Sequence, residues 1–259
     1  TAARIGPLLP REIPFLPQRA ILPETVVQVE ASLGAVEGAE RLTRAAALAW
    51  TGRSPEEAPV DPGPDAATAA ALQPDAESPD PVPPAAIAPV LLDASRPGSF
   101  PALVLDFGCE VVGYPEVDVR GSAGGVLSLW YGESLDLHRT DTLVMSGGED
   151  RFRPYHLRAF RYLKLVANNS LEPVEIRSVR MRLFLYPYGP GGTFRSSDPL
   201  LDRIWDTSVY TVRMNSLEHF VDCPLREQAQ WLADARVMAM ADYWALGSPA
   251  IVRKAIRQF

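Results

Sequence analysis

Five side chains near the C-terminal end of the chain are of the types that bind and cleave sugars. Asp222, Arg226, Glu227, Trp231 and Asp234 lie within thirteen consecutive residues. Carboxylates and arginine bind ring hydroxyls through charge-assisted hydrogen bonds, and an indole can cover the apolar face of a pyranose ring. A carboxyl group that is kept protonated beside such a ring can act as a general acid. This combination suggests glycoside hydrolysis.

A helix would bring three of these residues together. If the chain turns helical near Glu227, then Glu227, Trp231 and Asp234 fall at positions i, i+4 and i+7 on one face. The alternative is a solvated helix face, because acidic residues at helical spacing usually carry ordinary surface ion pairs. Spacing alone favours this alternative, so a sugar site needs support from more than spacing.

The order of residue types from Asp222 to Asp234 resembles that of a known family. The pattern Asp-Cys-Pro-x-Arg-Glu-x-x-x-Trp-x-x-Asp resembles the start of the catalytic domain in the bacterial α-L-rhamnosidases of glycoside hydrolase family 78. The resemblance implies that Glu227 is the general acid, which protonates the glycosidic oxygen of the leaving group. It further implies that four residues bind the substrate: Asp222, Arg226, Trp231 and Asp234.

The chain departs from the family pattern in the wall of the implied pocket. Many members have Gly-Trp-Thr-Gly-Asp where this chain has Gln-Trp-Leu-Ala-Asp at residues 230–234. This departure concerns the sugar specificity more than the class of reaction. Two alternatives to a rhamnosidase therefore stay open. One is a six-hairpin glycosidase for another sugar, and the other is a non-catalytic carbohydrate-binding or scaffold protein whose β-rich region binds the sugar.

The resemblance also implies a mechanism. It implies removal of terminal α-L-rhamnose by a single displacement with inversion, for which a second carboxylate must activate water roughly 6.5 to 9.5 Å from the acid. By the resemblance, that general base is a glutamate on a later hairpin, beyond Phe259. We therefore expect residues 1–259 alone to turn over very slowly or not at all.

Length and charge exclude several classes of partner. The chain has 259 residues, 47% of them hydrophobic, which is ample for a buried core and more typical of two domains than of one. The formal net charge is −7, but residues 54–95 contain eight Asp or Glu and no Lys or Arg, so the rest carries 25 basic and 24 acidic residues. Such a balance predicts no nucleic-acid and no membrane partner. The partner implied by the resemblance is a rhamnose-containing glycoside or oligosaccharide, and the oligomeric state is open.

Cysteines and histidines give no sign of a metal or a cofactor. The two cysteines, Cys109 and Cys223, are too few for a disulfide framework or a cysteine-based zinc site, and Cys223 is expected to be a packed structural thiol. The three histidines show no paired spacing of metal ligands, so we predict no metal and no cofactor. Low cysteine content favours the cytoplasm, but the chain begins at Thr1 rather than Met, which leaves the compartment open.

Four regions follow one another along the chain. Residues 1–50 are Pro-rich and extended with possible strands, and they are expected to join an upstream domain. Residues 51–97, which are rich in Pro, Ala and acidic residues, are expected to form a linker or a disordered insertion. Residues 98–190 alternate between apolar and polar types, as in Val117 and Val119, with turn signals between the alternating runs. This region is predicted to be an antiparallel β-sandwich.

Residues 196–259 are predicted to be helical. The first helix should begin at Asp198-Pro199, where Asp caps the helix and Pro fits its first position. The second should run from about Gln228 to Leu246 and end at Gly247. A third should start at Ser248-Pro249 and reach Phe259. The resemblance implies that these are the first helices of an (α/α)6 barrel of six hairpins, so the barrel is expected to be incomplete in this chain, which looks truncated at both ends.

Overall fold

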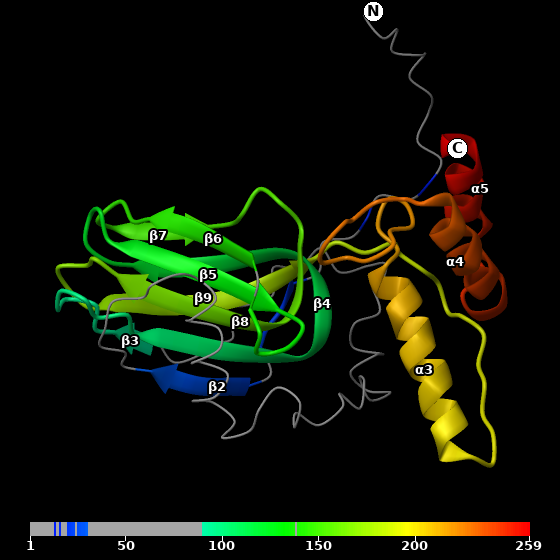
Figure 1. Ribbon diagram of the computed structural model, residues 1–259, viewed down its shortest axis with the longest axis horizontal. Helices are drawn as coiled ribbons and strands as arrows, with labels where there is room; N and C mark the ends of the chain where they lie inside the picture. Colours follow the sequence, from blue (N-terminus) through cyan, green and yellow to red (C-terminus); the bar gives the residue numbers. More distant parts are fainter. Residues whose placement is uncertain (1–12, 14–15, 17–19, 24, 31–89, 138) are drawn as a thin grey trace, which may run out of the picture.

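A computed structural model gives the structure of two parts of the chain, a β-sandwich and a set of helices beside it (Figure 1). The described residues are 13, 16, 20–23, 25–30, 90–137 and 139–259. Most of the predicted N-terminal segment and nearly all of the predicted linker lie outside these residues. The boundaries predicted for those two regions therefore stay predictions.

Nine strands form the sandwich in the described part of the chain, and every pair of neighbours is antiparallel. The predicted antiparallel sandwich is therefore confirmed. The strands are β1 (Ala20–Ile21), β2 (Thr25–Glu30), β3 (Val90–Leu92), β4 (Ala102–Arg120), β5 (Val126–Gly132), β6 (Arg139–Val144), β7 (Glu149–Phe152), β8 (Arg158–Asn168) and β9 (Val174–Leu183).

The long strand β4 belongs to both layers of the sandwich. Residues 102–106 pair with β2 and β8, and β8 continues through β5 to β6. Residues 113–120 pair with β9, and their final part also pairs with β7. The change of layer follows an irregularity in the pairing between Asp106 and Val111. Gly113 lies at the crossing, where an added Cβ would stand 2.0 Å from the Arg182 carbonyl oxygen, so only glycine allows this approach.

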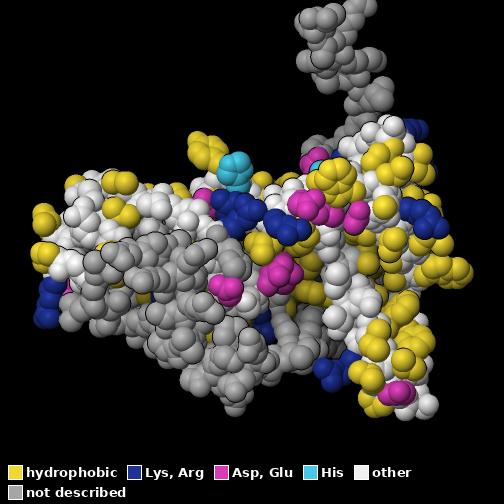
Figure 2. Space-filling model, in the orientation of Figure 1, with side chains coloured by type: hydrophobic (Ala, Val, Ile, Leu, Met, Phe, Trp, Pro, Cys, Tyr) yellow, Lys and Arg dark blue, Asp and Glu magenta, His cyan; other side chains and the backbone are white. Residues whose placement is uncertain are grey.

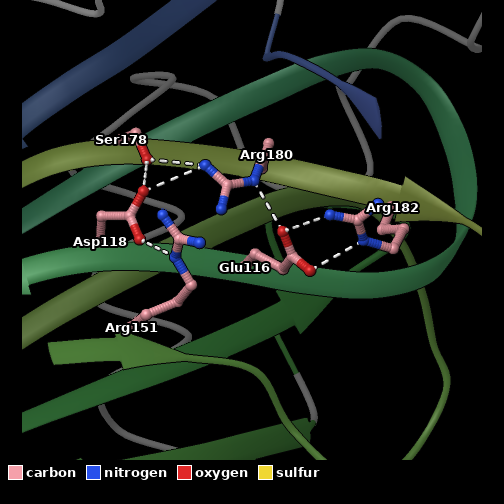
Figure 3. Close-up of polar contacts among 6 residues, drawn as sticks. All are labelled: Glu116, Asp118, Arg151, Ser178, Arg180 and Arg182. Atoms are coloured by element: carbon pink, nitrogen blue, oxygen red, sulfur yellow. Dashed lines mark hydrogen bonds and ion pairs between the residues drawn. The ribbon is translucent and has the colours of Figure 1, made fainter. Parts of the chain in front are cut away.

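The period-two pattern of β4 separates the core from the outer face. Val117 and Val119 are buried in the core between the layers, whereas Glu116 and Asp118 point away from it because successive strand residues alternate. On that outer face Glu116 accepts hydrogen bonds from Arg180 and Arg182 of β9, with Nε to carboxylate distances of 2.6 and 2.8 Å (Figure 3).

Asp118 extends the same ion-pair network to a third strand. Its carboxylate accepts from Arg151 of β7 at 2.7 Å, from Ser178 of β9 at 2.6 Å and from Arg180 at 3.0 Å (Figure 3). The network thus ties β7, β4 and β9 together on the outer face. Each carboxylate already accepts from several donors, so the role of the network is structural.

Three helices make up the second part of the structure: α3 (Pro199–Met214), α4 (Leu232–Ala245) and α5 (Pro249–Gln258). As predicted, Asp198 caps α3 by accepting from the Leu200 N–H at 2.9 Å, and Pro199 takes the first position. Gly247, with φ of +66°, follows α4, and its N–H donates to the Asp242 carbonyl. The start of α4 at Leu232 differs from the prediction and is explained with the site below.

The helices pack on the segment that leads out of the sandwich. Tyr186 and Tyr188 of this segment are buried with Phe220 and with residues of α4 and α5 in a second hydrophobic cluster. Gly192 donates its N–H to the Ala245 carbonyl at 2.8 Å. The outward faces of the helices carry many exposed hydrophobic side chains (Figure 2), among them Ile204, Val237, Met240 and Trp244.

Candidate active site

Four of the five predicted site residues lie in the loop between α3 and α4, which is closed between Asp222 and Ala229. The Asp222 N–H donates to the Ala229 carbonyl at 2.9 Å, and the Ala229 N–H donates to Asp222 Oδ1 at 3.0 Å. Inside this closure the Gln228 N–H donates to the Cys223 carbonyl at 3.2 Å. The loop is therefore held in a defined conformation without being part of a helix.

The predicted start of the second helix, at about Gln228, is wrong, and the chain does not turn helical at Glu227. Gln228 has a φ of +55°, in the left-handed region that a right-handed helix does not use. The N–H groups of Gln228 and Ala229 close the loop instead of joining a helical ladder, and α4 begins four residues later, at Leu232. Glu227, Trp231 and Asp234 therefore do not share one face of a helix.

Glu227 and Trp231 nevertheless meet. The Trp231 Nε1–H donates to Glu227 Oε2 at 2.8 Å, and Arg226 Nη2 lies 3.2 Å from Glu227 Oε1. Each oxygen of the carboxyl group thus has one donor, while 40% of the Glu227 side chain stays accessible. A carboxyl group that is oriented on both sides and still reachable can exchange a proton with a bound molecule.

Cys223 connects the two acidic residues of the loop, a role the sequence did not reveal. Its Sγ accepts from the Glu227 N–H at 3.3 Å and donates to Asp222 Oδ2 at 3.3 Å. Burial raises the pKa of Asp222, but hydrogen bonds from the Ala229 N–H and the Cys223 thiol outweigh burial and lower it below its usual value. Asp222 is therefore an ionised hydrogen-bond acceptor that also closes the loop.

Asp234 is the one predicted site residue that stands apart. It lies exposed in the first turn of α4, where a carboxylate interacts favourably with the helix dipole. Trp231, the residue before this helix, is 54% exposed. The structure thus brings Asp222, Arg226, Glu227 and Trp231 together in one loop, and it places Asp234 just beyond that loop.

The sandwich holds this loop at two points. Arg139 of β6 donates from Nη2 to the Arg226 carbonyl at 3.0 Å. The Gln228 side chain donates from Nε2 to the Leu157 carbonyl at 3.4 Å and to the Pro224 carbonyl, within the loop, at 2.7 Å. Figure 2 shows acidic, basic and hydrophobic side chains gathered where the sandwich meets the helices. The conformation around Glu227 therefore depends on residues of the other domain.

A buried carboxyl group supports the helices behind the loop. Asp242 of α4 is fully buried; its Oδ2 accepts from the Ser248 N–H at 3.2 Å, and its Oδ1 has no hydrogen-bond partner in the described part of the chain. Burial raises the pKa of Asp242 to about 6, although the hydrogen bond from the Ser248 N–H opposes the rise. No pattern in the sequence indicated that this residue would be buried.

Neither a metal cluster nor a membrane span is found within the described ranges. They contain no group of three or more His, Cys, Asp or Glu residues arranged to hold a metal ion. None of the three helices is both long enough and apolar enough to cross a membrane.

Two family models match the chain, one for each part of the structure. Residues 99–182 match the bacterial alpha-L-rhamnosidase concanavalin-like domain, and residues 190–259 match the bacterial alpha-L-rhamnosidase 6 hairpin glycosidase domain. Together these matches cover more than half of the chain. The chain belongs to the bacterial α-L-rhamnosidase family. The predicted fold class is confirmed for this chain: an antiparallel sandwich followed by the first helices of a six-hairpin domain.

Solved structures agree with this family. The chain is similar to a family 78 rhamnosidase of Bacillus sp. GL1, with 28% identity and a TM-score of 0.61, over 70% of this chain and 19% of that one. It shares its fold with a rhamnosidase from Klebsiella oxytoca that was solved with rhamnose bound, with 21% identity and a TM-score of 0.63, over 94% of this chain and 44% of that one. The chain therefore spans less than half the length of either structure. A comparison with curated proteins gave no match.

Proposed function

We propose that this chain carries the general acid of an enzyme that hydrolyses terminal α-L-rhamnosides, and that the acid is Glu227. The observation that carries the proposal is the carboxyl group of Glu227, oriented by Trp231 and Arg226 and still accessible. The family match and the similarity to the Bacillus rhamnosidase support the sugar class.

The proposed reaction is a single displacement with inversion. The proton of the Glu227 carboxyl group moves to the glycosidic oxygen as the bond from that oxygen to the anomeric carbon breaks. A water molecule attacks the anomeric carbon from the opposite face, and its proton goes to a second carboxylate, the general base. Asp222, Arg226, Trp231 and Asp234 are proposed to bind the rhamnose ring, with the carboxylates accepting from its hydroxyls.

The general base is proposed to come from a residue outside residues 1–259. The expectation that these 259 residues alone turn over very slowly or not at all therefore stays a prediction. Its test is the rate of rhamnoside hydrolysis by a polypeptide of residues 1–259, beside that of the full-length protein. Equal rates would place the base within this chain.

The role of Glu227 is tested by Glu227→Gln in the full-length protein. Loss of a general acid lowers hydrolysis of rhamnosides with sugar leaving groups by about 10²- to 10⁴-fold. Aryl rhamnosides should lose far less, because their leaving groups need little protonation. Glu172→Gln, at an exposed glutamate of the sandwich, is the matched control and should leave both rates unchanged. Equal losses on both substrates would contradict the assignment.

The stereochemistry and the sugar are tested separately. NMR of the first product released should show the anomer opposite to that of the substrate, and release of the same anomer would rule out inversion. Hydrolysis of matched aryl glycosides of several sugars should be fastest for α-L-rhamnose. A faster reaction with another sugar would favour a six-hairpin glycosidase of different specificity.

A further inference from the structure

The loop that holds Glu227 has two unlike neighbours. On one side Trp231, bound to the Glu227 carboxyl group, leads directly into α4 of the helical part. On the other side the residues that flank Glu227 in sequence are bound to the sandwich, Arg226 through its carbonyl and Gln228 through its side chain. The acid therefore stands at the border between the two domains.

The position of the acid also determines where the two halves of the substrate lie. A general acid gives its proton to the oxygen that joins the cleaved sugar to the leaving group, so the two halves of the substrate lie on either side of the acid. The proposed rhamnose-binding residues Trp231 and Asp234 lie at the start of α4. Asp222 and Arg226 lie in the loop itself, so a rhamnose ring held against Trp231 and Asp234 would direct the leaving group toward the sandwich.

The sandwich displays an aromatic side chain beside this border. Tyr155, in the connection between β7 and β8, is 99% exposed, and the next residue, His156, is exposed too. Leu157, two residues after Tyr155, is the residue whose carbonyl binds Gln228. A fully exposed tyrosine side chain is uncommon, because its ring has a large apolar surface that is usually at least partly buried.

The connection that carries Tyr155 is anchored on both sides. Pro154 is buried, and Leu157 packs against the sandwich core. The following Arg158 forms two hydrogen bonds with the Asp141 carboxylate, Nε to Oδ2 at 2.8 Å and Nη2 to Oδ1 at 2.7 Å. Because only Tyr155 and His156 lie exposed between these anchors, the connection presents their side chains from a fixed base.

We propose that Tyr155, His156 and Arg139 on this edge of the sandwich bind the leaving group of the rhamnoside. This inference rests on the proposed function. The phenol of Tyr155 offers a flat apolar face on which a ring can stack, either a sugar ring or an aromatic ring. The exposed imidazole of His156 and the remaining N–H donors of Arg139 can bind hydroxyls of that ring.

The test is Tyr155→Ala in the full-length protein, assayed with three substrates. Methyl α-L-rhamnoside has no ring to stack, phenyl α-L-rhamnoside has an aromatic ring, and a rhamnosyl-glucose disaccharide has a sugar ring. We expect kcat/KM to fall about tenfold for at least one of the two ring-bearing substrates and to stay unchanged for the methyl glycoside. A loss on the disaccharide alone identifies a sugar leaving group, and a loss on the phenyl glycoside alone identifies an aromatic one.

Two further variants make the result specific. Tyr155→Phe keeps the ring and should retain the kcat/KM of the unaltered protein. Leu171→Ala removes another side chain of the sandwich that is 87% exposed and should change no rate. An equal loss on all three substrates, or no loss on any, overturns the inference. If the unaltered protein hydrolyses no rhamnoside at all, the proposed function fails first and this inference falls with it.

Discussion

The sandwich and the helical part each bury a carboxyl group, but they do so in opposite ways. Glu116 of the sandwich accepts from two arginines. Burial raises its pKa, but the hydrogen bonds and charges of Arg182 and Arg180 outweigh burial and lower it. Asp242 of α4 has a single donor at Oδ2, and burial raises its pKa to about 6. Burial alone therefore does not decide the charge of a group; the number of donors around it does.

This difference gives the two parts opposite dependences on pH. A group whose pKa is lowered on folding contributes stability above its unfolded pKa, near 4.5 for Glu116, and that stability is lost as the pH falls through the folded pKa. A carboxyl group whose pKa is raised contributes stability below its unfolded pKa, near 3.8 for Asp242. That contribution is lost as the pH rises through about 6. Acid thus weakens the sandwich at Glu116 and strengthens the helical part at Asp242.

The largest expected effect on stability comes from Glu116→Ala. Removing one partner of a buried ion pair leaves the arginines without their shared acceptor and should cost about 3 kcal/mol of unfolding free energy at pH 7. Urea denaturation of the sandwich measures the loss, which should shrink as the pH falls below about 4.5 and the unaltered Glu116 becomes protonated. Glu172→Ala, at an exposed position, should change stability by less than about 0.5 kcal/mol. A loss that does not depend on pH would show that Glu116 acts through packing alone.

Asp242→Asn is expected to act in the opposite direction. Asparagine keeps an acceptor for the Ser248 N–H but carries no charge, so at pH 7 the variant should be more stable by about 2 kcal/mol. At pH 4 the two proteins should differ little, because Asp242 is then mostly protonated in the folded state. Urea denaturation at pH 4, 5, 6 and 7 follows the crossover. Lower stability of the variant at pH 7 would mean that the charged form of Asp242 is stabilised by its surroundings.

The loop around Glu227 should be sensitive in activity rather than in stability. Cys223→Ala removes the sulfur that accepts from the Glu227 N–H and donates to Asp222. We expect kcat for rhamnoside hydrolysis by the full-length protein to fall about tenfold with little change in KM, the size of one lost hydrogen bond. Cys223→Ser keeps a donor and an acceptor and should recover most of this loss. Equal activity of the alanine variant would show that the thiol does not position the acid.

The smallest expected effect belongs to the contact between the domains. With methyl α-L-rhamnoside, whose leaving group has no ring to bind, Arg139→Ala removes only the hydrogen bond to the Arg226 carbonyl, so kcat/KM should fall only severalfold, equivalent to about 1 kcal/mol. The urea midpoint of the sandwich should not move. Arg139→Lys, which can still donate to the carbonyl, is the control. A drop in stability as large as that of Glu116→Ala would mean that Arg139 holds the sandwich itself together.

The sequence predicted what depends on local chemistry. Alternation of Val117 and Val119 with polar residues identified half-buried strands, and Asp198-Pro199 marked the start of α3, because side-chain period and cap chemistry act over a few residues. The residue types between Asp222 and Asp234 also directed attention to one place in the molecule. The roles assigned to those residues stay predictions.

What the sequence missed depends on distant contacts. The left-handed backbone of Gln228 is supported by a side-chain contact with Leu157, which is 71 residues away, and Arg139 contacts Arg226 across 87 residues. No local pattern encodes such partners. The helical spacing from Glu227 to Asp234 therefore predicted a helix in place of the loop. The burial of Asp242 was not predicted for the same reason, because Tyr188 and Ser248 lie beside it only after the helices have packed.

The path of β4 through both layers has a consequence for the order in which the molecule folds. Its partners come from four other strands spread along the chain, from β2 through β7 and β8 to β9. Such non-local pairing is slow, because long loops must close before the contacts form. The layer of β2, β8, β5 and β6 cannot be completed before β8 has been synthesised, and the other layer must wait for β9. The helical segment emerges from the ribosome after β9. The finished edge of the sandwich can then serve as a template on which the loop bearing Glu227 takes its shape.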